Sequence, residues 1–255
     1  MNEVIGLIPA AGQARRISPL PCSKELYPVG FWSSPAERDS RPKVVSHYLL
    51  EKMQAAGIAK AYIVLRQGKW DIPAYLGDGE LLNMHLAYLM MGLPYGVPYT
   101  LDQAYPFVQD HLVAFGFPDI LFQPYDAFVR LLAKKAASNA DIMLGLFPAD
   151  SPQQVDMVNL DENDRVRQIV IKPRQTPLRF TWGIAVWTPV FTAFLHEHLA
   201  NLKGSMAAKP ELTMGHVIDA AVSSDLKVEA VIVSNDPYLD IGTPENLLRA
   251  IRNVQ

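Results

Sequence analysis

The sequence predicts an α/β fold built on a mostly parallel mixed sheet. Short apolar runs of strand length alternate along the 255 residues with segments whose apolar residues recur at helical spacing. The first predicted strand, helix and second strand follow one another closely, which indicates a right-handed βαβ crossover and two parallel strands. No internal repeat and no linker interrupts the pattern, so we expect a single domain over residues 1–255.

The predicted elements follow in chain order. Val4–Ile8 is an apolar run that suits a buried first strand. A helix of about 14 residues is expected around Val45, Leu49 and Met53, with Gly57 at its C′ position. Between them, the polar loop at 30–40 is longer than a connector requires, and we interpret it as an insertion that forms either a lid or tolerated surface. Further strands are predicted at 61–65, 112–115, 142–147, 166–171, 183–187 and 228–233, and further helices at 127–137, 190–202, 215–222 and 244–252.

The composition is that of an ordinary soluble globular protein, and it excludes several classes of partner. Hydrophobic residues make up 49% of the chain, charged residues 19%, and the formal net charge is −3. Binding to nucleic acid needs a basic surface, so no nucleic acid partner is expected. The apolar stretch 81–97 is too interrupted to span a bilayer, so no membrane partner is expected either. A single cysteine, Cys22, and the lack of a basic region before the first apolar run predict a cytoplasmic location.

The segment Pro9–Val29, PAAGQARRISPLPCSKELYPV, is predicted to bind phosphate at the end of the first strand. Gly12 allows backbone N–H groups to approach an anion closely. Arg15, Arg16 and Lys24 add cations that neutralise an oligophosphate and a reacting phosphoryl group. A glycine loop beside basic residues is also common in solvated turns, so both interpretations stay open on this segment alone.

Two aspartates are candidate metal ligands. Asp119 follows a predicted strand at the carboxyl edge of the sheet, where open α/β sheets bind their ligands. Asp240 lies in the stretch YLDIGTP. Together they offer the carboxylate oxygens that Mg²⁺ takes from a protein, with phosphate and water filling its other positions. The alternative for each aspartate is that it caps a turn.

These stretches resemble the signature of the sugar-phosphate nucleotidyltransferases, and most of all that of glucose-1-phosphate thymidylyltransferase-like enzymes. The chain has AAGQARRISP and SKELYPV, where the family has A-G-G-x-G-T-R-L-x-P and S/P-K-x-L-x-P-V. Asp119 stands in DILF, similar to the family's G-D-x-L/I-F, and Asp240 in YLDIGT, similar to W-x-D-x-G-T. The motifs occur in the family's order over nearly the whole chain. The resemblance implies a Rossmann-like three-layer nucleotidyltransferase fold of the GT-A-like kind. Because the sequence ends soon after Gly242, we expect no C-terminal β-helix domain of the kind that many relatives append.

The resemblance also implies a role for each matching position. Arg16 and Lys24 are the expected catalytic residues, Arg16 on the leaving pyrophosphate and Lys24 on the α-phosphoryl group. Asp119 and Asp240 are the expected ligands of Mg²⁺. The expected nucleotide-binding residues are Ala11, Gly12, Arg15 and Met91, and the expected residues for the phosphorylated acceptor are Asp156, Lys172 and Gly183.

The departures from the family motifs gather at positions that read the base and the sugar. Met91 stands where the family has a glutamine, and a thioether cannot replace the two-way hydrogen bonding of an amide. Asp156 stands in place of a glycine, and Ile171 in place of the glutamate that precedes the phosphate-binding lysine. Positions that handle phosphate and metal are kept. This selective change favours altered substrates over lost activity.

The sequence therefore predicts a Mg²⁺-dependent enzyme that transfers a nucleotidyl group from an NTP to a sugar-1-phosphate or related phosphorylated acceptor and releases pyrophosphate. The alternative is a catalytically lapsed homologue that binds a nucleotide or sugar nucleotide as a regulator or scaffold. The cluster His196-Glu197-His198 is not expected to bind metal, because residues two apart point to different faces of a helix. The base, the acceptor and the oligomeric state, a homo-oligomer included, stay open.

Overall fold

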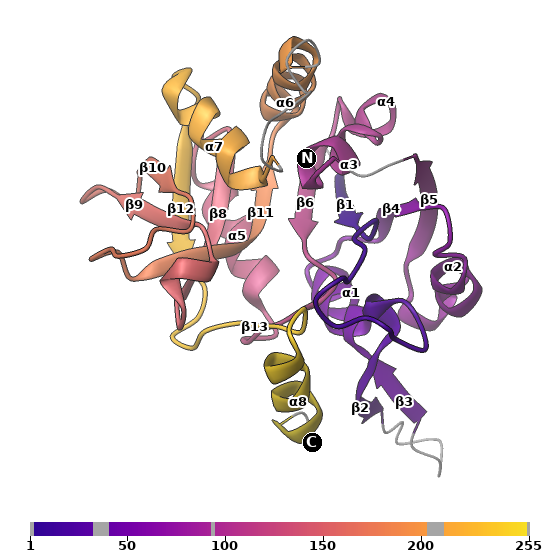
Figure 1. Cartoon of the computed structure of the whole chain (residues 1–255). Coiled ribbons are helices and arrows are strands. Elements are labelled where there is room, and N and C mark those ends of the chain that lie inside the picture. The colour runs from indigo at the N-terminus through magenta and orange to yellow at the C-terminus, as the bar shows by residue number, and fades with distance from the viewer. Residues whose placement is uncertain (1–2, 33–40, 93–94, 203–211, 254–255) are drawn as a thin grey trace.

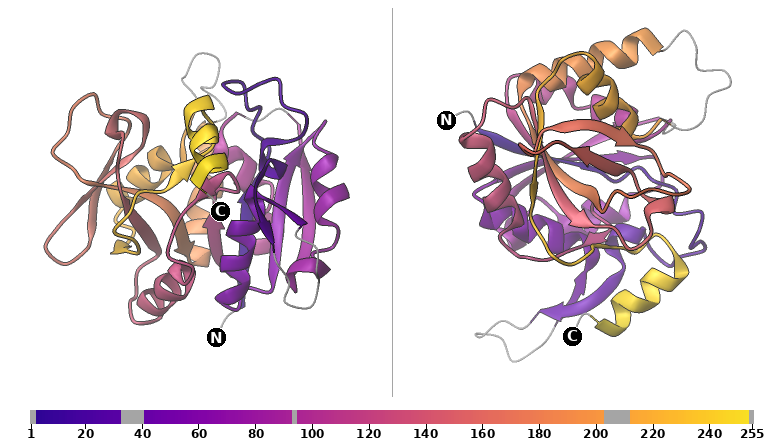
Figure 2. Two further views of the ribbon diagram at one scale, coloured as in Figure 1. Left: turned by 90° about the horizontal axis from the view of Figure 1, so that it is seen from below. Right: turned by 90° about the vertical axis from the view of Figure 1, so that its left-hand side faces the viewer.

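The chain folds into a central mixed sheet with helices on both faces (Figures 1 and 2). The computed structural model describes residues 3–32, 41–92, 95–202 and 212–253. Within these ranges the main sheet has nine strands, and two small two-stranded sheets lie outside it. This architecture confirms the α/β prediction with a mixed sheet whose central strands are mostly parallel.

The first half of the main sheet is parallel. β1 (Val4–Pro9) lies between β4 (Lys60–Arg66) and β6 (Leu112–Gly116), and β5 (His85–Met91) extends the sheet beyond β4. β1, the helix that follows it and β4 form the predicted crossover. Because parallel strands end at the same edge, the loops after β1 and β6 meet there.

The second half of the sheet is mixed and branches at β11 (Phe180–Trp187). β11 runs antiparallel to β6 and to β8 (Ile142–Pro148), and β12 (Val228–Ile232) continues the sheet in parallel with β8. The other branch is the hairpin of β9 (Met157–Leu160) and β10 (Val166–Val170), which reaches β11 through the pair Thr181 and Met157.

Two hydrophobic clusters, one on each face of the sheet, hold the helices in place. Neighbouring strand residues enter opposite clusters, as Leu7 and Ile8 do in β1 and Trp187 and Val186 do in β11. The first cluster is covered by α3 (Val97–Asp102), α4 (Tyr105–Val108), α6 (Pro189–Leu202) and α7 (Met214–Ser223). The second is covered by α1 (Val45–Ala55), α2 (Asp71–Leu76) and α5 (Ala127–Ala136). The result is the expected three-layer arrangement.

A third, smaller cluster brings the C-terminal segment to the strand ends. It joins β2 (Pro28–Trp32), β7 (Ile120–Leu121) and α8 (Pro244–Asn253). α8 lies beside β2, which forms a hairpin with β3 (Arg41–Val44) (Figure 1). β13 (Leu239–Asp240) pairs antiparallel with β7. The remaining short elements are η1 (Lys24–Leu26), η2 (Glu80–Leu82) and η3 (Pro152–Gln154).

Local capping signals in the sequence are confirmed. α1 ends in a Schellman motif, in which Ile58 N donates to Met53 O at 3.0 Å and Gly57, at φ +79°, donates to Gln54 O at 2.9 Å. α8 begins at Pro244, and Thr243 Oγ1 accepts a hydrogen bond from Asn246 N at 3.3 Å.

Other elements differ from the prediction. β5 and the β2–β3 and β9–β10 hairpins were not predicted as such, and α1 has 11 residues rather than the expected 14 or so. The loop predicted at 30–40 begins later, because Gly30–Trp32 belong to β2; residues 33–40 lie outside the described ranges. None of the helices in the described ranges is long and apolar enough to cross a membrane.

Lowering the pH is expected to destabilise the fold through His47 on α1. This side chain is 2% exposed, and its Nδ1 accepts a hydrogen bond from Trp32 Nε1 at 3.3 Å, which requires a neutral ring. Burial and the charge of Lys43 lower the pKa of His47 from 6.5 to about 4. In the unfolded chain the ordinary pKa applies, so the stability due to neutral His47 is complete above pH 6.5 and is lost as the pH falls toward 4.

The loss should reach roughly 2 to 3 kcal/mol by pH 4.5, measured by urea unfolding at pH 7 and pH 4.5. His47→Gln should show a flatter pH dependence than wild type, whereas His85→Gln, at an exposed position, should follow wild type. Equal pH dependence in wild type and His47→Gln would contradict the assignment.

Candidate active site

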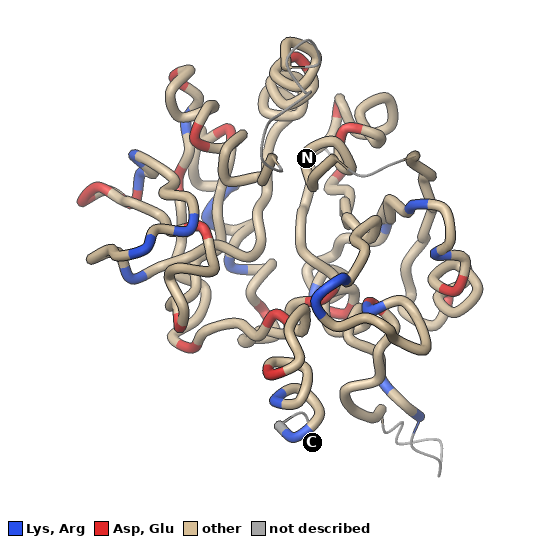
Figure 3. The backbone as a smooth tube through the Cα atoms, in the orientation of Figure 1, with Lys and Arg blue, Asp and Glu red and all other residues tan. Residues whose placement is uncertain are grey.

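Four predicted residues converge at the carboxyl edge of the parallel strands. The loop after β1 carries Arg16, η1 carries Lys24, the turn after β6 carries Asp119, and β13 carries Asp240. The two aspartates are neighbours because Ile241 N, next to Asp240, donates to Asp119 O at 3.1 Å. Figure 3 shows the basic stretch of the loop after β1 beside the acidic stretch of β13.

Lys24 and Asp119 form an ion pair with little exposure, 17% for the lysine side chain and 11% for the aspartate. Burial raises the pKa of Asp119, but the Lys24 ammonium and its hydrogen bond outweigh burial and leave that pKa below its usual value. Burial lowers the pKa of Lys24, but the charges of Asp119 and Glu25 outweigh it and leave that pKa above its usual value. Both groups are therefore charged at neutral pH.

Arg16 and Asp240 form a looser pair. Arg16 Nη2 lies 3.7 Å from Asp240 Oδ2, and the arginine side chain is 64% exposed. An ion pair of this kind contributes little stability, so the guanidinium is available to a ligand. Asp240 is better fixed, since Gly242 N donates to its Oδ1 at 2.7 Å. Burial and the charge of Asp119 raise the pKa of Asp240.

Asp119 and Asp240 bring two carboxylates together at the strand edge. The described ranges contain no group of three or more His, Cys, Asp and Glu side chains that could hold a metal ion. Two carboxylates suit Mg²⁺, which takes its remaining ligands from phosphate and water. In the cluster at 196–198, His196 Nδ1 lies 2.8 Å from Asp102 Oδ1, and His198 stacks on Phe194 instead of meeting His196.

A second cluster gathers around Asp156, which directly precedes β9. Thr213 Oγ1 donates to Asp156 Oδ2 at 3.3 Å, and Oδ1 is buried with no hydrogen-bond partner. Burial raises the pKa of Asp156, and the opposing charge of Lys172 does not cancel that shift. Gly215, at the start of α7, has room only for hydrogen, because an ideal Cβ would lie 2.3 Å from Asp156 Oδ2 and 2.8 Å from Ile171 Cδ1. The Asp156 carboxylate thus lies beside Ile171, the position where the family motif has a glutamate.

Tyr238 lies between the two clusters. An ideal Cβ on Gly183 would lie 3.2 Å from the Tyr238 ring, so the predicted acceptor residue Gly183 is in contact with that ring. Burial raises the pKa of Tyr238 to about 12 and outweighs its hydrogen bond with Thr181, and the charges of Asp240 and Asp156 raise the pKa further. Sequence reasoning did not assign Tyr238 to the site. The available signal was its place two residues before Asp240, where the family motif has a tryptophan.

The predicted nucleotide-binding residues separate into two groups. Gly12 lies beside Lys24, since an ideal Cβ would be 3.8 Å from its Nζ, and Arg15 Nε donates to Gln13 Oε1 at 2.7 Å on the surface. Ala11 and Met91 are 1% and 9% exposed and belong to the first hydrophobic cluster. Among the predicted acceptor residues, Lys172 has a backbone φ of +40°, which is unusual for a residue other than glycine.

Comparisons with known proteins point to one family. The model of a family described as nucleotidyl transferase matches residues 5–255. The chain is 23% identical over 249 residues to a low-salt glycan biosynthesis nucleotidyltransferase of Haloferax volcanii, covering 96% of this chain and 64% of that protein. It is 22% identical over 250 residues to a glucose-1-phosphate thymidylyltransferase of Streptomyces antibioticus, covering 97% and 65%. The chain therefore spans less than two thirds of the length of these relatives.

The fold has a close counterpart among solved structures. A candidate glucose-1-phosphate thymidylyltransferase from Bacillus anthracis, crystallised with sucrose, superposes with a TM-score of 0.80 at 18% identity. The match covers 99% of this chain and 96% of that one. At this identity the likeness establishes the fold, and it confirms the nucleotidyltransferase fold expected from the sequence.

Gly215→Ala is expected to destabilise the protein by about 1 to 3 kcal/mol, because the new methyl group overlaps the Asp156 carboxylate. Urea unfolding measures the loss, and Asp156→Ala in the same chain should recover a large part of it. Gly92→Ala is the control, since nothing lies within 4 Å of its ideal Cβ. If the changes in the free energy of unfolding caused by Gly215→Ala and Asp156→Ala are strictly additive, the predicted overlap between these two positions is wrong.

Proposed function

We propose that the chain, which belongs to the nucleotidyl transferase family, is an enzyme. It transfers a nucleotidyl group from an NTP to a sugar-1-phosphate or related phosphorylated acceptor and releases pyrophosphate. The observation that carries the proposal is the convergence of Arg16, Lys24, Asp119 and Asp240 at one strand edge. The names of the two curated relatives, a thymidylyltransferase and a glycan biosynthesis nucleotidyltransferase, point to the same class of reaction.

The loop after β1 and η1 supply what a triphosphate needs. The backbone at Gly12 approaches the Lys24 ammonium, so an anion held by the loop N–H groups also meets that cation. Arg16 is exposed and only loosely paired, which suits a guanidinium that neutralises the leaving pyrophosphate. We assign the nucleotide to Ala11, Gly12 and Arg15 in this loop and to Met91 at the end of β5.

Asp119 and Asp240 are the residues that would hold Mg²⁺. They fit a divalent cation, because two adjacent carboxylates repel one another and Asp119 already raises the pKa of Asp240. When bound, Mg²⁺ supplies charge neutralisation on the reacting phosphates. The Gly242 N–H keeps the Asp240 carboxylate oriented for this purpose.

The protein residues contribute position and charge to the transfer. The Asp119 carboxylate keeps the pKa of Lys24 high, so Lys24 meets the α-phosphoryl group as an ammonium. The acceptor phosphate is already ionised at neutral pH, so the reaction requires no general base. Lys172 is the cation assigned to that acceptor phosphate, with Asp156 and Gly183 lining the acceptor side.

We also propose a domain organisation, a set of partners and a cellular location for this protein. We assign residues 1–255 to a single domain, supported by a main sheet whose strands begin at Val4 and end at Ile232. Its partners are an NTP and a small phosphorylated acceptor, and a net charge of −3 gives no support to a nucleic acid partner. The single cysteine supports a cytoplasmic location.

The alternative function is that of a lapsed homologue which binds a nucleotide or sugar nucleotide without turnover. Met91 is buried and Ile171 is apolar, so neither presents a polar group to a base or a sugar hydroxyl. Binding without turnover in the experiment below would favour this alternative.

Thermal melting with each common NTP and dNTP, with and without Mg²⁺, tests nucleotide binding. A nucleotide at 100 times its Kd adds about 2.7 kcal/mol, which raises the melting temperature by roughly 5–10 °C for a chain of this size. We expect a Mg²⁺-dependent shift with one base, followed by pyrophosphate release when sugar-1-phosphates are added. Asp119→Asn should abolish the Mg²⁺ dependence. The absence of a shift with every nucleotide would contradict the proposal.

Arg16→Ala is expected to lower turnover about 100-fold or more, because it removes charge neutralisation from the leaving group. Its melting temperature without ligand should stay close to that of wild type, since Arg16 is exposed and weakly paired. Arg130→Ala removes another half-exposed arginine with an aspartate partner and should leave both quantities unchanged. Full turnover in Arg16→Ala would overturn its role.

A further inference from the structure

The residues on both sides of Lys24 contact one short segment, which consists of the loop that joins β4 to α2 and the first residue of α2. Ser23, before Lys24, contacts Asp71, and Glu25, after it, contacts Lys69. These contacts join positions 44 and 48 residues apart in the chain. Nothing in the proposed chemistry uses Lys69 or Asp71 directly.

The contact to Ser23 is double. Asp71 accepts a hydrogen bond from Ser23 N at 2.6 Å through Oδ2 and one from Ser23 Oγ at 2.7 Å through Oδ1. Because one of these bonds involves the backbone, it fixes the chain immediately before η1 and not only a side chain. The start of η1 is therefore held against the start of α2.

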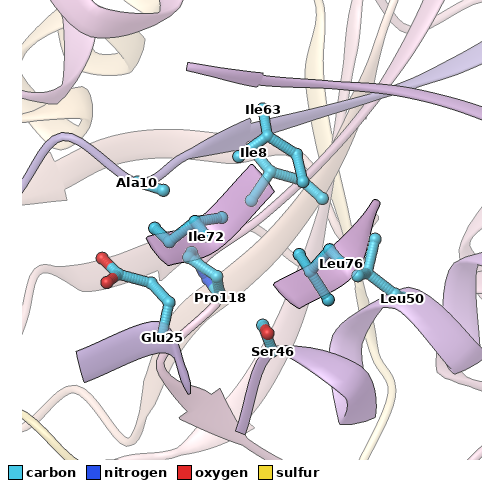
Figure 4. Close-up of a pocket in the computed structure, with 9 residues that line it drawn as sticks. All are labelled: Ile8, Ala10, Glu25, Ser46, Leu50, Ile63, Ile72, Leu76 and Pro118. Carbon is cyan, nitrogen blue, oxygen red and sulfur yellow. The ribbon is translucent and has the colours of Figure 1, made fainter. Parts of the chain in front are cut away.

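The contact to Glu25 is a buried ion pair. Lys69 Nζ lies 2.6 Å from both carboxylate oxygens, and the two residues are 4% and 1% exposed. Glu25 lies at the wall of a small apolar cavity, beside Ile72 and Pro118 (Figure 4). The wall is otherwise apolar except for Ser46, whose hydroxyl makes no hydrogen bond within the described residues, so Lys69 is the group that satisfies the Glu25 carboxylate.

We propose that Lys69 and Asp71 are positioning residues for Lys24: through Glu25 and Ser23 they fix η1 so that the Lys24 ammonium is held at Asp119, beside the site of transfer. The inference rests on the proposed function, which makes Lys24 the group that acts on the α-phosphate. A lysine side chain has a flexible four-carbon stem, so its reach is defined only if its own backbone is fixed. The contacts of Ser23 with Asp71 and of Glu25 with Lys69 fix the backbone on both sides of Lys24.

Stability alone does not account for the ion pair. Taking two charges out of water offsets much of their attraction, so a buried pair contributes little net stability compared with apolar residues of the same volume. Removing one partner, in contrast, leaves an uncompensated buried charge. A double replacement therefore separates the effect on folding from the effect on the position of Lys24.

The experiment compares wild type, Lys69→Met, the double variant Glu25→Gln with Lys69→Met, and Lys60→Met. Lys60, at the other end of β4, forms an exposed ion pair with Glu3 at 2.9 Å and is the matched control. In the double variant we expect a melting temperature near that of wild type and a kcat lower by roughly 10- to 100-fold, with the KM for the nucleotide changed much less. A double variant that melts like wild type and keeps its kcat overturns the proposal.

Lys69→Arg provides a second variant that keeps the charge and the fold. A guanidinium is larger than an ammonium and meets a carboxylate with two nitrogens instead of one, which should shift Glu25 and η1, so kcat should fall several-fold while the melting temperature holds. Asp71→Ala, which removes the other anchor, should change kcat in the same direction. If kcat is unchanged in both variants, Lys69 and Asp71 do not position Lys24.

A readout without turnover keeps this inference separate from the proposed function. With ¹³C-labelled lysine, the side-chain signal of Lys24, assigned through Lys24→Arg, reports its contact with Asp119. The double variant should move this signal toward its position in Asp119→Asn, and Lys60→Met should leave it in place. If the Lys24 signal moves as expected but the protein is inactive with every nucleotide, the proposed function is wrong and the positioning role of Lys69 and Asp71 stands. An unmoved signal overturns the positioning role whether or not the protein is active.

Discussion

The buried ion pair between Lys24 and Asp119 is the interaction on which the candidate site depends. It joins η1, reached from the end of β1, to the turn at the end of β6, and the two strands lie side by side in the sheet. Asp119 O in turn accepts from Ile241 N, so the C-terminal segment is attached at the same point. Three distant parts of the chain thus meet at two residues, Lys24 and Asp119. Since either charge alone would be buried without compensation, both ends of the pair must be in place before the site is complete.

Sequence reasoning succeeded where the signal is local. The apolar run Val4–Ile8, the Gly57 cap of α1 and the Thr243 start of α8 each depend on a few neighbouring residues, and all three are confirmed. The positions of Asp119 and Asp240 next to each other follow from their motifs and from the rule that ligands gather at the carboxyl edge of such a sheet. Here the local pattern and the overall topology lead to the same arrangement.

The parts that were missed depend on contacts that the sequence does not display. β5 contains His85 and Tyr88 among apolar residues, and only its pairing with β4 shows that it is a strand. Glu25 and Lys69 are ordinary charged residues in the sequence, and their burial together follows only from the packing of η1 against α2. The assignment of Met91 to the nucleotide, which comes from a motif position, stays a prediction; its side chain packs within the first hydrophobic cluster.

The charges around the site balance one another. Arg16, Lys24 and Lys69 carry three positive charges, and Asp240, Asp119 and Glu25 carry three negative ones, each in contact with its opposite. These six charged side chains are together electroneutral and project little net electrostatic potential into solution, so they do little to accelerate the approach of a polyanion without counter-ions. A polyphosphate that arrives with its own counter-ion changes this charge balance least, because it adds positive and negative charge together. Encounter with the ligand should then depend weakly on ionic strength, and recognition is decided by short-range contacts within the site.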